Sequence, residues 1–325
     1  MKTSRRILGC AFALAVTAVM APTAVAQTFP SRLITVVVPY PAGGTVDVVA
    51  RIIIERARES LGQPIVVDNR TGAAGVIGTT LVSRASADGY TLLMASQSHT
   101  ANPSLYRNIN WDPVKSFSPI ALVGVIPNVL AVHSSSPFKT LQEFVAHAKA
   151  NPGKLNYSSG GVGTSLHLTG EMLKQAAGIN LVHVPYKSDA EGFSALRAGD
   201  VAVSPFGIAN VKPWIDAGEI RPLAISSRKR AAMLPDVPTA AQSGFPNLEV
   251  NPWYAFLAPA GTPPAVVARL NAAIVAAMKA PDVQAKLVGL GMELEPGTPA
   301  QLESFLRADT DRWSKLIRDA GIRLE

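Results

Sequence analysis

Residues 33–54, LITVVVPYPAGGTVDVVARIII, contain the pattern that decides the fold. The continuous β-type run at residues 33–38 predicts a strand that is buried on both faces. Apolar residues then recur at helical spacing over residues 46–61, and Gly62 stands where a helix should end. Two adjacent glycines lie in the turn between these elements. A strand, a glycine turn and a helix in this order are typical of α/β folds.

The same alternation continues along the chain. Strands are predicted at residues 65–67 and 90–95 with a helix at 75–85 between them, and this β-α-β-α-β order favours a parallel sheet with helices on both faces. The pattern restarts after Pro127. Capping boxes, T-L-Q-E and T-P-A-Q, predict two helix starts. The further predicted elements are strands at 156–158, 181–184, 201–203 and 223–226, and helices at 140–148, 164–177, around 193–196, 263–280, 282–290 and from 298 to about 317.

This order predicts two lobes after an N-terminal targeting segment. Residues 1–26 have a basic start, a short apolar run and an A-V-A cleavage pattern, which indicates a secretory signal peptide. The last helix is expected to pack back on the first lobe. The predicted domains are therefore lobe 1, residues 27–126 plus 252–325, and lobe 2, residues 127–251. We expect a monomer in the periplasm.

Composition excludes several function classes. The only cysteine, Cys10, lies inside the predicted signal peptide, so the mature chain has no thiol for disulfides, catalysis or metal binding. Loss of that segment removes three cationic residues and no acid, which lowers the formal charge from +7 to +4. The basic run 228–230 is short and is interpreted as a solvated loop, so no nucleic-acid partner is predicted. A mild positive field suits an anionic solute.

Two glycine turns share one physical design. Residues 39–47, PYPAGGTVD, and residues 158–165, SSGGVGTS, each lie between a predicted strand and a predicted helix. Uncovered backbone N–H groups and the partial positive charge of a helix start can bind an anion at such turns. One turn lies in each lobe, so the two could hold a carboxylate between them; ordinary structural turns are the alternative. A third cluster, residues 72–80, either lines the rim or serves packing.

Catalytic and metal signals are weak. No G-x-S-x-G or H-E-x-x-H motif occurs, no histidine pair has metal-ligand spacing, and no dinucleotide motif is complete, so neither metal nor cofactor is predicted. Ser159, His167 and Asp47 could form a nucleophilic triad, but no sequence feature places them in the required order. Asp47 is expected to bind amides at the helix start, and His167 is either a ligand contact or a structural residue. Tyr40 and Trp253 could each wall a cleft or belong to the core.

An ordered series of motifs makes the chain resemble a known family, the Bug-type substrate-binding proteins of tripartite tricarboxylate transporters. The resemblance runs from about Phe29 to the C-terminus. The segments that carry it are ITVVVP (34–39) with GGTVDVVAR (43–51), LGQPIVVDNR (61–70), DGYTLL (88–93), YSSG (157–160), HVPYK (183–187), LPDVPT (234–239) and APAGTP (258–263).

The resemblance implies a type II periplasmic-binding-protein fold, with two Rossmann-like lobes that close on a ligand. It implies a small organic acid as ligand, held by main-chain groups and ordered waters between the glycine turns. The binding residues carried over by position are Tyr40, Gly43, Gly44, Asp47, Ser159, Gly160, Gly163, Thr164 and His167. Gln97 and Ser98, just after the strand at 90–95, are expected to line the cleft as well.

Two segments depart from the family pattern. Ser188-Asp189-Ala190 replaces a usual glycine and a following Pro-Ala, and Pro205-Phe206 replaces a usual Phe-Asp pair. Asp189 could favour a ligand with an amine or another donor group, whereas Phe206 could favour a less polar one. The identity of the ligand therefore does not transfer from relatives.

The function predicted from the sequence is that of an extracytoplasmic solute-binding protein, not an enzyme. It captures a small carboxylate-bearing ligand for uptake through membrane permease subunits. A receptor that presents its closed form to a sensor kinase is the alternative, and a periplasmic hydrolase that uses Ser159 is the less favoured one.

Overall fold

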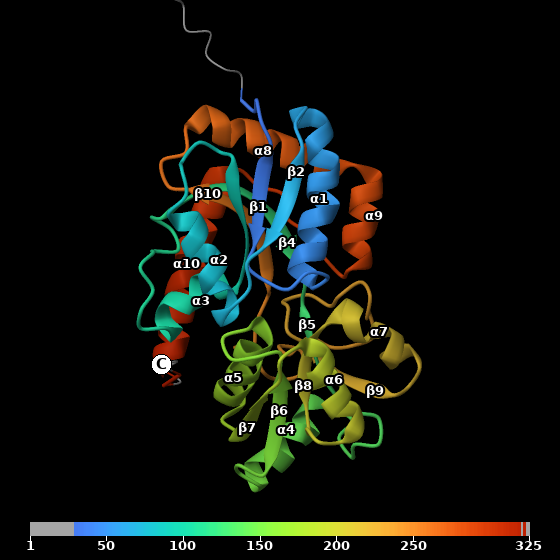
Figure 1. Cartoon of the computed structure of the whole chain (residues 1–325). Coiled ribbons are helices and arrows are strands. Elements are labelled where there is room, and N and C mark those ends of the chain that lie inside the picture. Colours follow the sequence, from blue (N-terminus) through green and yellow to red (C-terminus); the bar gives the residue numbers. More distant parts are fainter. Residues whose placement is uncertain (1–28, 320, 323–325) are drawn as a thin grey trace, which may run out of the picture.

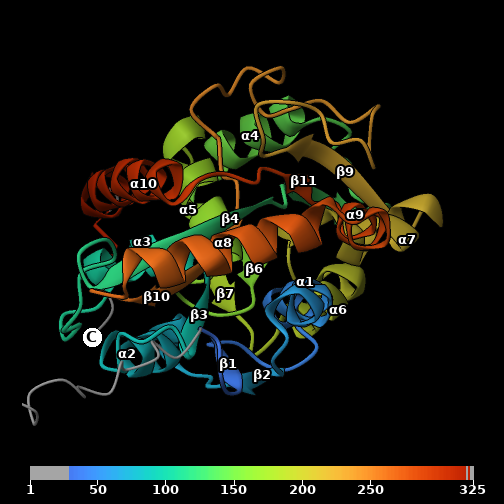
Figure 2. The ribbon, with the colours of Figure 1, turned by 90° about the horizontal axis from the view of Figure 1, so that it is seen from above.

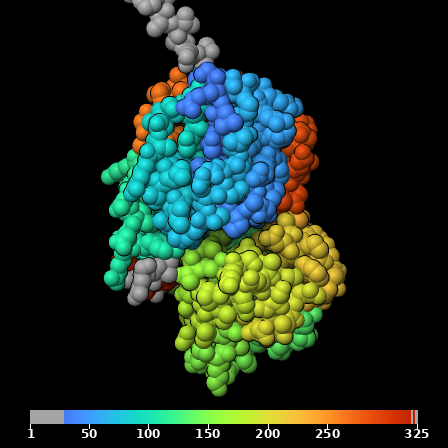
Figure 3. Space-filling view, in the orientation of Figure 1, coloured from blue at the N-terminus to red at the C-terminus, as the bar shows by residue number. Residues whose placement is uncertain are grey.

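The computed structural model describes residues 29–319, 321 and 322, which form a mixed α/β protein in two parts (Figure 1). The predicted signal peptide and Cys10 lie outside these described residues. Within them, every helix is either too short or too polar to span a bilayer. In the space-filling view the blue and cyan part lies above the yellow-green part, and the two meet along a continuous boundary (Figure 3).

The upper part is built on a six-stranded sheet with strand order β11-β4-β10-β3-β1-β2. Strand β1 pairs in parallel with both β2 and β3, while β10 runs antiparallel between β3 and β4. β11 is a short antiparallel edge strand. These strands span Ile34–Val38 (β1), Ile65–Asn69 (β2), Thr91–Ser96 (β3), Phe117–Val125 (β4), Trp253–Pro259 (β10) and Glu293–Leu294 (β11).

Both faces of this sheet are covered, which explains the continuous apolar runs in its strands. Val36 packs with helices α1, α8 and α9, whereas its neighbour Val37 points to the face that α2 and α10 cover. In the view from above, α1 and α9 lie on one side of the strands and α2 and α10 on the other, while α8 crosses in front of them (Figure 2). The helices of this part span Thr45–Leu61 (α1), Val76–Ser83 (α2), Ser98–Leu105 (α3), Pro264–Lys279 (α8), Pro281–Gly289 (α9) and Pro299–Asp319 (α10), with the short 3-10 helix η1 at Ala73–Gly75.

The lower part, which we call the inserted part, is the chain between β4 and β10. It holds an antiparallel sheet β8-β5-β9 and a parallel pair β6-β7, joined by a bridge between Tyr157 and Val203. Its elements are Asn128–His133 (β5), Leu141–Ala150 (α4), Leu155–Ser159 (β6), Ser165–Ala177 (α5), Leu181–Pro185 (β7), Asp189–Ala198 (α6), Ser204–Gly207 (β8), Ile208–Asp216 (α7) and Ile220–Ile225 (β9).

Helix α10 packs against both parts. Leu302 and Leu306 contact the core of the six-stranded sheet. Trp313, Leu316 and Ile317 near its end belong to the core cluster of the inserted part. The last helix therefore packs on the first part as expected, and it also contacts the second.

The structure confirms most local predictions and corrects three. Both capping boxes form, at Thr140 and at Thr298. The upper sheet is mixed rather than parallel. The prediction missed β4, β10 and β11, which form its antiparallel pairs. The strand expected at residues 201–203 lies instead at β8, where a proline is tolerated because β8 is an edge strand. Strand β5 and helices α3 and α7 were also not predicted.

Candidate functional site

A cleft of about 680 Å³ lies where the two parts meet. Five helices begin at its walls: α1 and α3 from the upper part, and α5, α6 and α7 from the inserted part. Lys187 and Asp189 are the only charged residues among those that line it. The full lining is Tyr40, Pro41, Ala42, Gly43, Gly44, Thr45, Val46, Ser96, Gln97, Ser98, Gly160, Thr164, Ser165, Leu166, Lys187, Ser188, Asp189, Ala190, Phe193, Phe206, Asn210, Val211, Pro252 and Tyr254.

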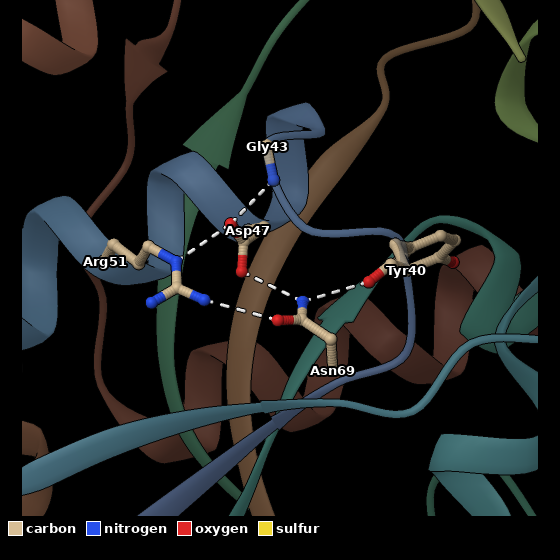
Figure 4. Close-up of polar contacts among 5 residues, drawn as sticks. All are labelled: Tyr40, Gly43, Asp47, Arg51 and Asn69. Atoms are coloured by element: carbon tan, nitrogen blue, oxygen red, sulfur yellow. Dashed lines mark hydrogen bonds and ion pairs between the residues drawn. The ribbon is translucent and has the colours of Figure 1, made fainter.

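The first glycine loop, residues 39–44, is held from behind by the carboxylate of Asp47. One of its oxygens accepts from the Gly43 N–H and from Arg51 Nε, each at 2.9 Å. The other accepts from Asn69 Nδ2 at 2.9 Å, and the same amide donates to the Tyr40 carbonyl at 3.0 Å (Figure 4). The network fixes both ends of the loop.

Asp47 is ionised in this setting. Its side chain is 2% exposed, and burial alone would raise its pKa. Hydrogen bonds from Arg51, the Gly43 amide and Asn69 outweigh that effect and hold the pKa of Asp47 below its usual value. The expected role of Asp47, binding amides at the helix start, is confirmed.

This arrangement leaves amide donors facing the cleft. Gly43 has φ +78°, in the left-handed region that glycine adopts without strain, which lets the loop turn into α1. The N–H groups of Thr45 and Val46 have no acceptor among the described residues, as expected for the first turn of a helix. Both residues line the cleft. The start of α1 thus offers unpaired donors and a partial positive charge to an anion.

The second glycine loop, residues 160–164, is held by hydroxyl groups instead of a charge. Ser159 Oγ accepts from the Gly161 N–H at 3.2 Å. The Thr164 hydroxyl donates to the Gly161 carbonyl at 2.7 Å, and it also caps α5 by accepting from the His167 N–H. Gly163 has φ +82°. The N–H groups of Ser165 and Leu166, at the start of α5, likewise have no acceptor within the described chain.

Two histidines lie directly behind this second loop. The Gly163 N–H donates to His167 Nδ1 at 3.2 Å, and His183 Nε2 lies 2.7 Å from Ser159 Oγ. The two imidazole rings are in contact, with centroids 4.3 Å apart, and Tyr157 stacks on His183. Burial lowers the pKa of each histidine to about 4, so both are neutral near pH 7. His167 is therefore a structural support for the loop.

The second loop contacts the upper part at one corner of the cleft. Ser98 Oγ, at the start of α3, donates to the Gly163 carbonyl at 3.0 Å. A side chain at Gly163 would press against Ala74 and Leu105 of the upper part. Ala74, which has φ +49°, accepts hydrogen bonds through its carbonyl from Asn102 and Tyr40. The second glycine loop is therefore held against α3 and η1 of the upper part in this conformation.

The structure also settles three alternatives left open by the sequence. Tyr40 lines the cleft, whereas Trp253 is fully buried and donates to Asp309 at 2.7 Å. The third glycine cluster serves packing: Gly75 lies against Tyr40, and Gly78 against Pro39 and the Arg70 carbonyl. None of its residues lines the cleft.

Nine of the thirteen residues predicted for the site line this cleft: Tyr40, Gly43, Gly44, Gln97, Ser98, Gly160, Thr164, Asp189 and Phe206. The other four, Asp47, Ser159, Gly163 and His167, lie behind the loops and hold them. Sequence reasoning missed His183, although it stands in the quoted HVPYK segment, because its partner Ser159 is 24 residues away. It also missed Asn210 and Tyr254, which lie on elements that were not predicted.

The contact between Ser159 and His183 does not form a nucleophilic site. Ser159 is 2% exposed and is not part of the cleft lining. Its predicted partner Asp47 stands in the other part of the molecule, bonded to Arg51. No group of three or more His, Cys, Asp or Glu side chains within the described ranges has the geometry of a metal site.

Comparison with protein families identifies this arrangement. The model of the tripartite tricarboxylate transporter family receptor matches residues 49–322. The chain belongs to this receptor family. Its members are periplasmic solute-binding proteins, not enzymes, and the family resemblance seen in the sequence is confirmed.

Solved structures show the same fold in this receptor family. The periplasmic binding protein BugD is 35% identical and covers 91% of this chain and all of its own, with a TM-score of 0.81. A protein from R. palustris solved with adipate is 35% identical over 91% of this chain and all of its own, at TM-score 0.83. MatC from Rhodopseudomonas palustris, solved with bound malate, is 32% identical over 89% of this chain and all of its own, at TM-score 0.81. The predicted periplasmic-binding-protein fold is confirmed.

Proposed function

We propose that the protein is a periplasmic receptor that captures a small carboxylate-bearing solute in the cleft and delivers it to the permease subunits of a tripartite tricarboxylate-type transporter. The observation that carries the proposal is the convergence of unpaired amides from α1 and α5 on one cleft. Such donors bind a carboxylate without a basic side chain. Relatives solved with adipate and malate support this ligand class.

Residues 27–126 plus 252–325 and residues 127–251 act as the two lobes in this proposal. The ligand contacts are the cleft-lining residues of the two glycine loops together with Gln97 and Ser98, and bridging waters complete them. Such waters rearrange at low cost, so one cleft tolerates several acids. Closure around the ligand then presents a surface that a membrane partner recognises.

The amide donors can be tested one at a time. Proline is tolerated at the first position of a helix, where it removes the N–H and keeps the backbone angles. Thr45 and Ser165 hold that position in α1 and α5, and the residues before them are extended, as proline requires. Malate and adipate binding should be measured by isothermal titration calorimetry for Thr45→Pro and Ser165→Pro, with Thr45→Ala and Ser165→Ala as controls that keep the N–H.

We expect each proline variant to bind about tenfold more weakly than its alanine control, because a hydrogen bond to a charged group is lost. Melting temperatures should stay close to that of the wild type. Equal affinity in the proline and alanine variants would show that these two amides do not bind the ligand. Absence of binding of both acids to the wild type would contradict a receptor for these acids.

The membrane partner needs a cellular test. Uptake of labelled malate or adipate, whichever binds, should fall in a deletion strain and return with the wild-type gene. A normal uptake rate together with lost transcriptional induction by the acid would favour delivery to a sensor kinase. Catalysis is not expected, since Ser159 is buried; ester turnover that Ser159→Ala abolishes would contradict this.

A further inference from the structure

The cleft is electrically asymmetric. On the upper side the start of α1 presents amide donors, and its one acid, Asp47, is turned away and neutralised by Arg51. On the opposite side the carboxylate of Asp189, the first residue of α6, stands in the cleft. It packs so closely over Gly160 that a side chain at Gly160 would collide with it. The cleft therefore has two poles. The start of α1 offers donors to an anion and is called the anion pole, and the Asp189 carboxylate offers an acceptor and is called the acceptor pole.

The Asp189 carboxylate has no partner in the part of the chain that the structure describes. Among the described residues it forms no hydrogen bond and no ion pair, and Lys187 nearby is exposed and makes no bridge to it. Asp189 itself is an exposed residue, so its carboxylate is open to the solvent of the cleft. An open carboxylate without a protein partner is available to accept from a cationic or N–H donor of a ligand, in a charge-assisted hydrogen bond.

A second group in the cleft also lacks partners. Gln97 is 1% exposed and lines the cleft, yet neither the nitrogen nor the oxygen of its side-chain amide has a hydrogen-bond partner. Buried polar groups in native proteins are almost always satisfied. This amide has free hydrogen-bonding capacity beside the cleft, although neither of its polar atoms is open to solvent in this conformation.

The remaining walls are apolar and aromatic. Phe193 and Phe206 pack edge to face, with ring centroids 5.7 Å apart, and Tyr254 and Pro252 face the same space. These residues can cover a hydrocarbon chain or ring between the two poles.

We infer that the cleft selects ligands that carry a carboxylate at one end and a nitrogen N–H donor, an ammonium or an amide, at the other, and that Asp189 is the residue that binds this donor. The inference rests on the proposed function and names its ligand class. The ligand carboxylate lies at the start of α1, its middle packs against Phe193 and Phe206, and its donor group reaches Asp189.

Ligands that differ only in the group at one end test the contributions of the two poles separately. Two series vary only in the distal group: adipate, hexanoate and 6-aminohexanoate, and succinate, butanoate and 4-aminobutanoate. Their dissociation constants should be measured at pH 7.5 for the wild type, for Asp189→Asn, and for Glu191→Gln. Glu191 lies on the same helix but outside the cleft lining and accepts from the Lys187 N–H, which a glutamine oxygen can still do. That control removes the same charge without touching the acceptor pole.

We expect the amino acid of at least one series to bind at least tenfold more tightly than its dicarboxylate in the wild type and in Glu191→Gln. Asp189→Asn should reduce this ratio at least tenfold, mainly by weakening the amino acid, because the charge-assisted contact is lost. Circular dichroism and melting temperature verify that the variant folds.

Two results overturn the inference in different ways. If dicarboxylates bind as tightly as the amino acids and Asp189→Asn leaves the ranking unchanged, Asp189 does not select the ligand, while the receptor function stands. If no compound of either series binds to the wild type, although the protein is folded, the proposed function fails and the inference fails with it.

Discussion

The two glycine loops offer the same kind of donor to the cleft but are held in different ways. The first depends on an ionised carboxylate, Asp47, with a guanidinium and an amide around it. The second depends on the hydroxyls of Ser159 and Thr164 and on two neutral histidines. Orienting backbone amides toward an anion therefore does not require one particular support. Both supports weaken as pH falls, but in different pH ranges.

The largest effect should come from removing the charged support. Asp47→Ala leaves the Gly43 amide, Arg51 and Asn69 without their common acceptor. We expect a loss of about 2–3 kcal/mol in the free energy of unfolding, measured by urea denaturation. Glu55→Ala, which breaks only the exposed pair with Arg58 on the same helix, should cost less than about 1 kcal/mol. Equal costs would mean that the Asp47 network does not hold the loop.

An intermediate effect should appear when the pH is lowered far enough to protonate the two neutral histidines behind the second loop. The pKa values of His167 and His183 are lowered from 6.5 to about 4. Below about pH 6.5 the unfolded chain binds protons that the folded chain does not, so stability is complete above that pH and is lost as pH falls toward about 4. Asp47 behaves differently: its folded pKa lies below 3.8, so its contribution is lost only below that value.

Urea denaturation at pH 7.5, 6, 5 and 4 tests this contrast. His183→Asn should flatten the loss of stability between pH 6.5 and 4. It should not abolish it, because His167 and the buried His99, whose pKa is also lowered to about 4, still titrate in the same direction. An unchanged slope in His183→Asn would show that protonation of this residue does not oppose folding.

The smallest effect should distinguish two helix caps of similar strength. Thr164 caps α5 at the cleft, and Thr140 caps α4 far from it. Replacing either threonine with alanine should cost about 1 kcal/mol of stability. Only Thr164→Ala should also weaken malate or adipate binding, because it releases the Gly161 carbonyl and loosens the loop. Calorimetry on both variants checks this, and a matching loss of affinity in Thr140→Ala would contradict the local role of the cap.

Local patterns predicted the parts of the site that are local in sequence. A strand, a glycine turn and a helix start follow one another within about ten residues at each loop, so the positions of Gly43 and Thr164 followed from the sequence. The partner of Ser159 did not. It depends on β6 lying parallel to β7 in the register that sets Tyr157 opposite His183, and apolar periodicity does not determine register between strands.

The missed elements depend on tertiary contacts. Helix α3 has the polar sequence SHTANPSL with a proline inside, which local propensity disfavours. It forms in a buried position where Thr100 bonds to Asp309 of α10 at 2.6 Å and Ser104 to Ser314 at 2.8 Å. Strand β10 was not predicted, since its pairing with β3 and β4 joins residues about 130 to 160 positions apart.

The position of β10 has a consequence for how the chain assembles. β4 touches the rest of the upper sheet only through β10, apart from the short strand β11. Residues 91–125 therefore cannot complete that sheet until residues 253–259 have been synthesised, and the whole inserted part lies between them. Sheets that need such distant segments fold slowly. The six-stranded sheet therefore closes only after nearly all of the polypeptide is present.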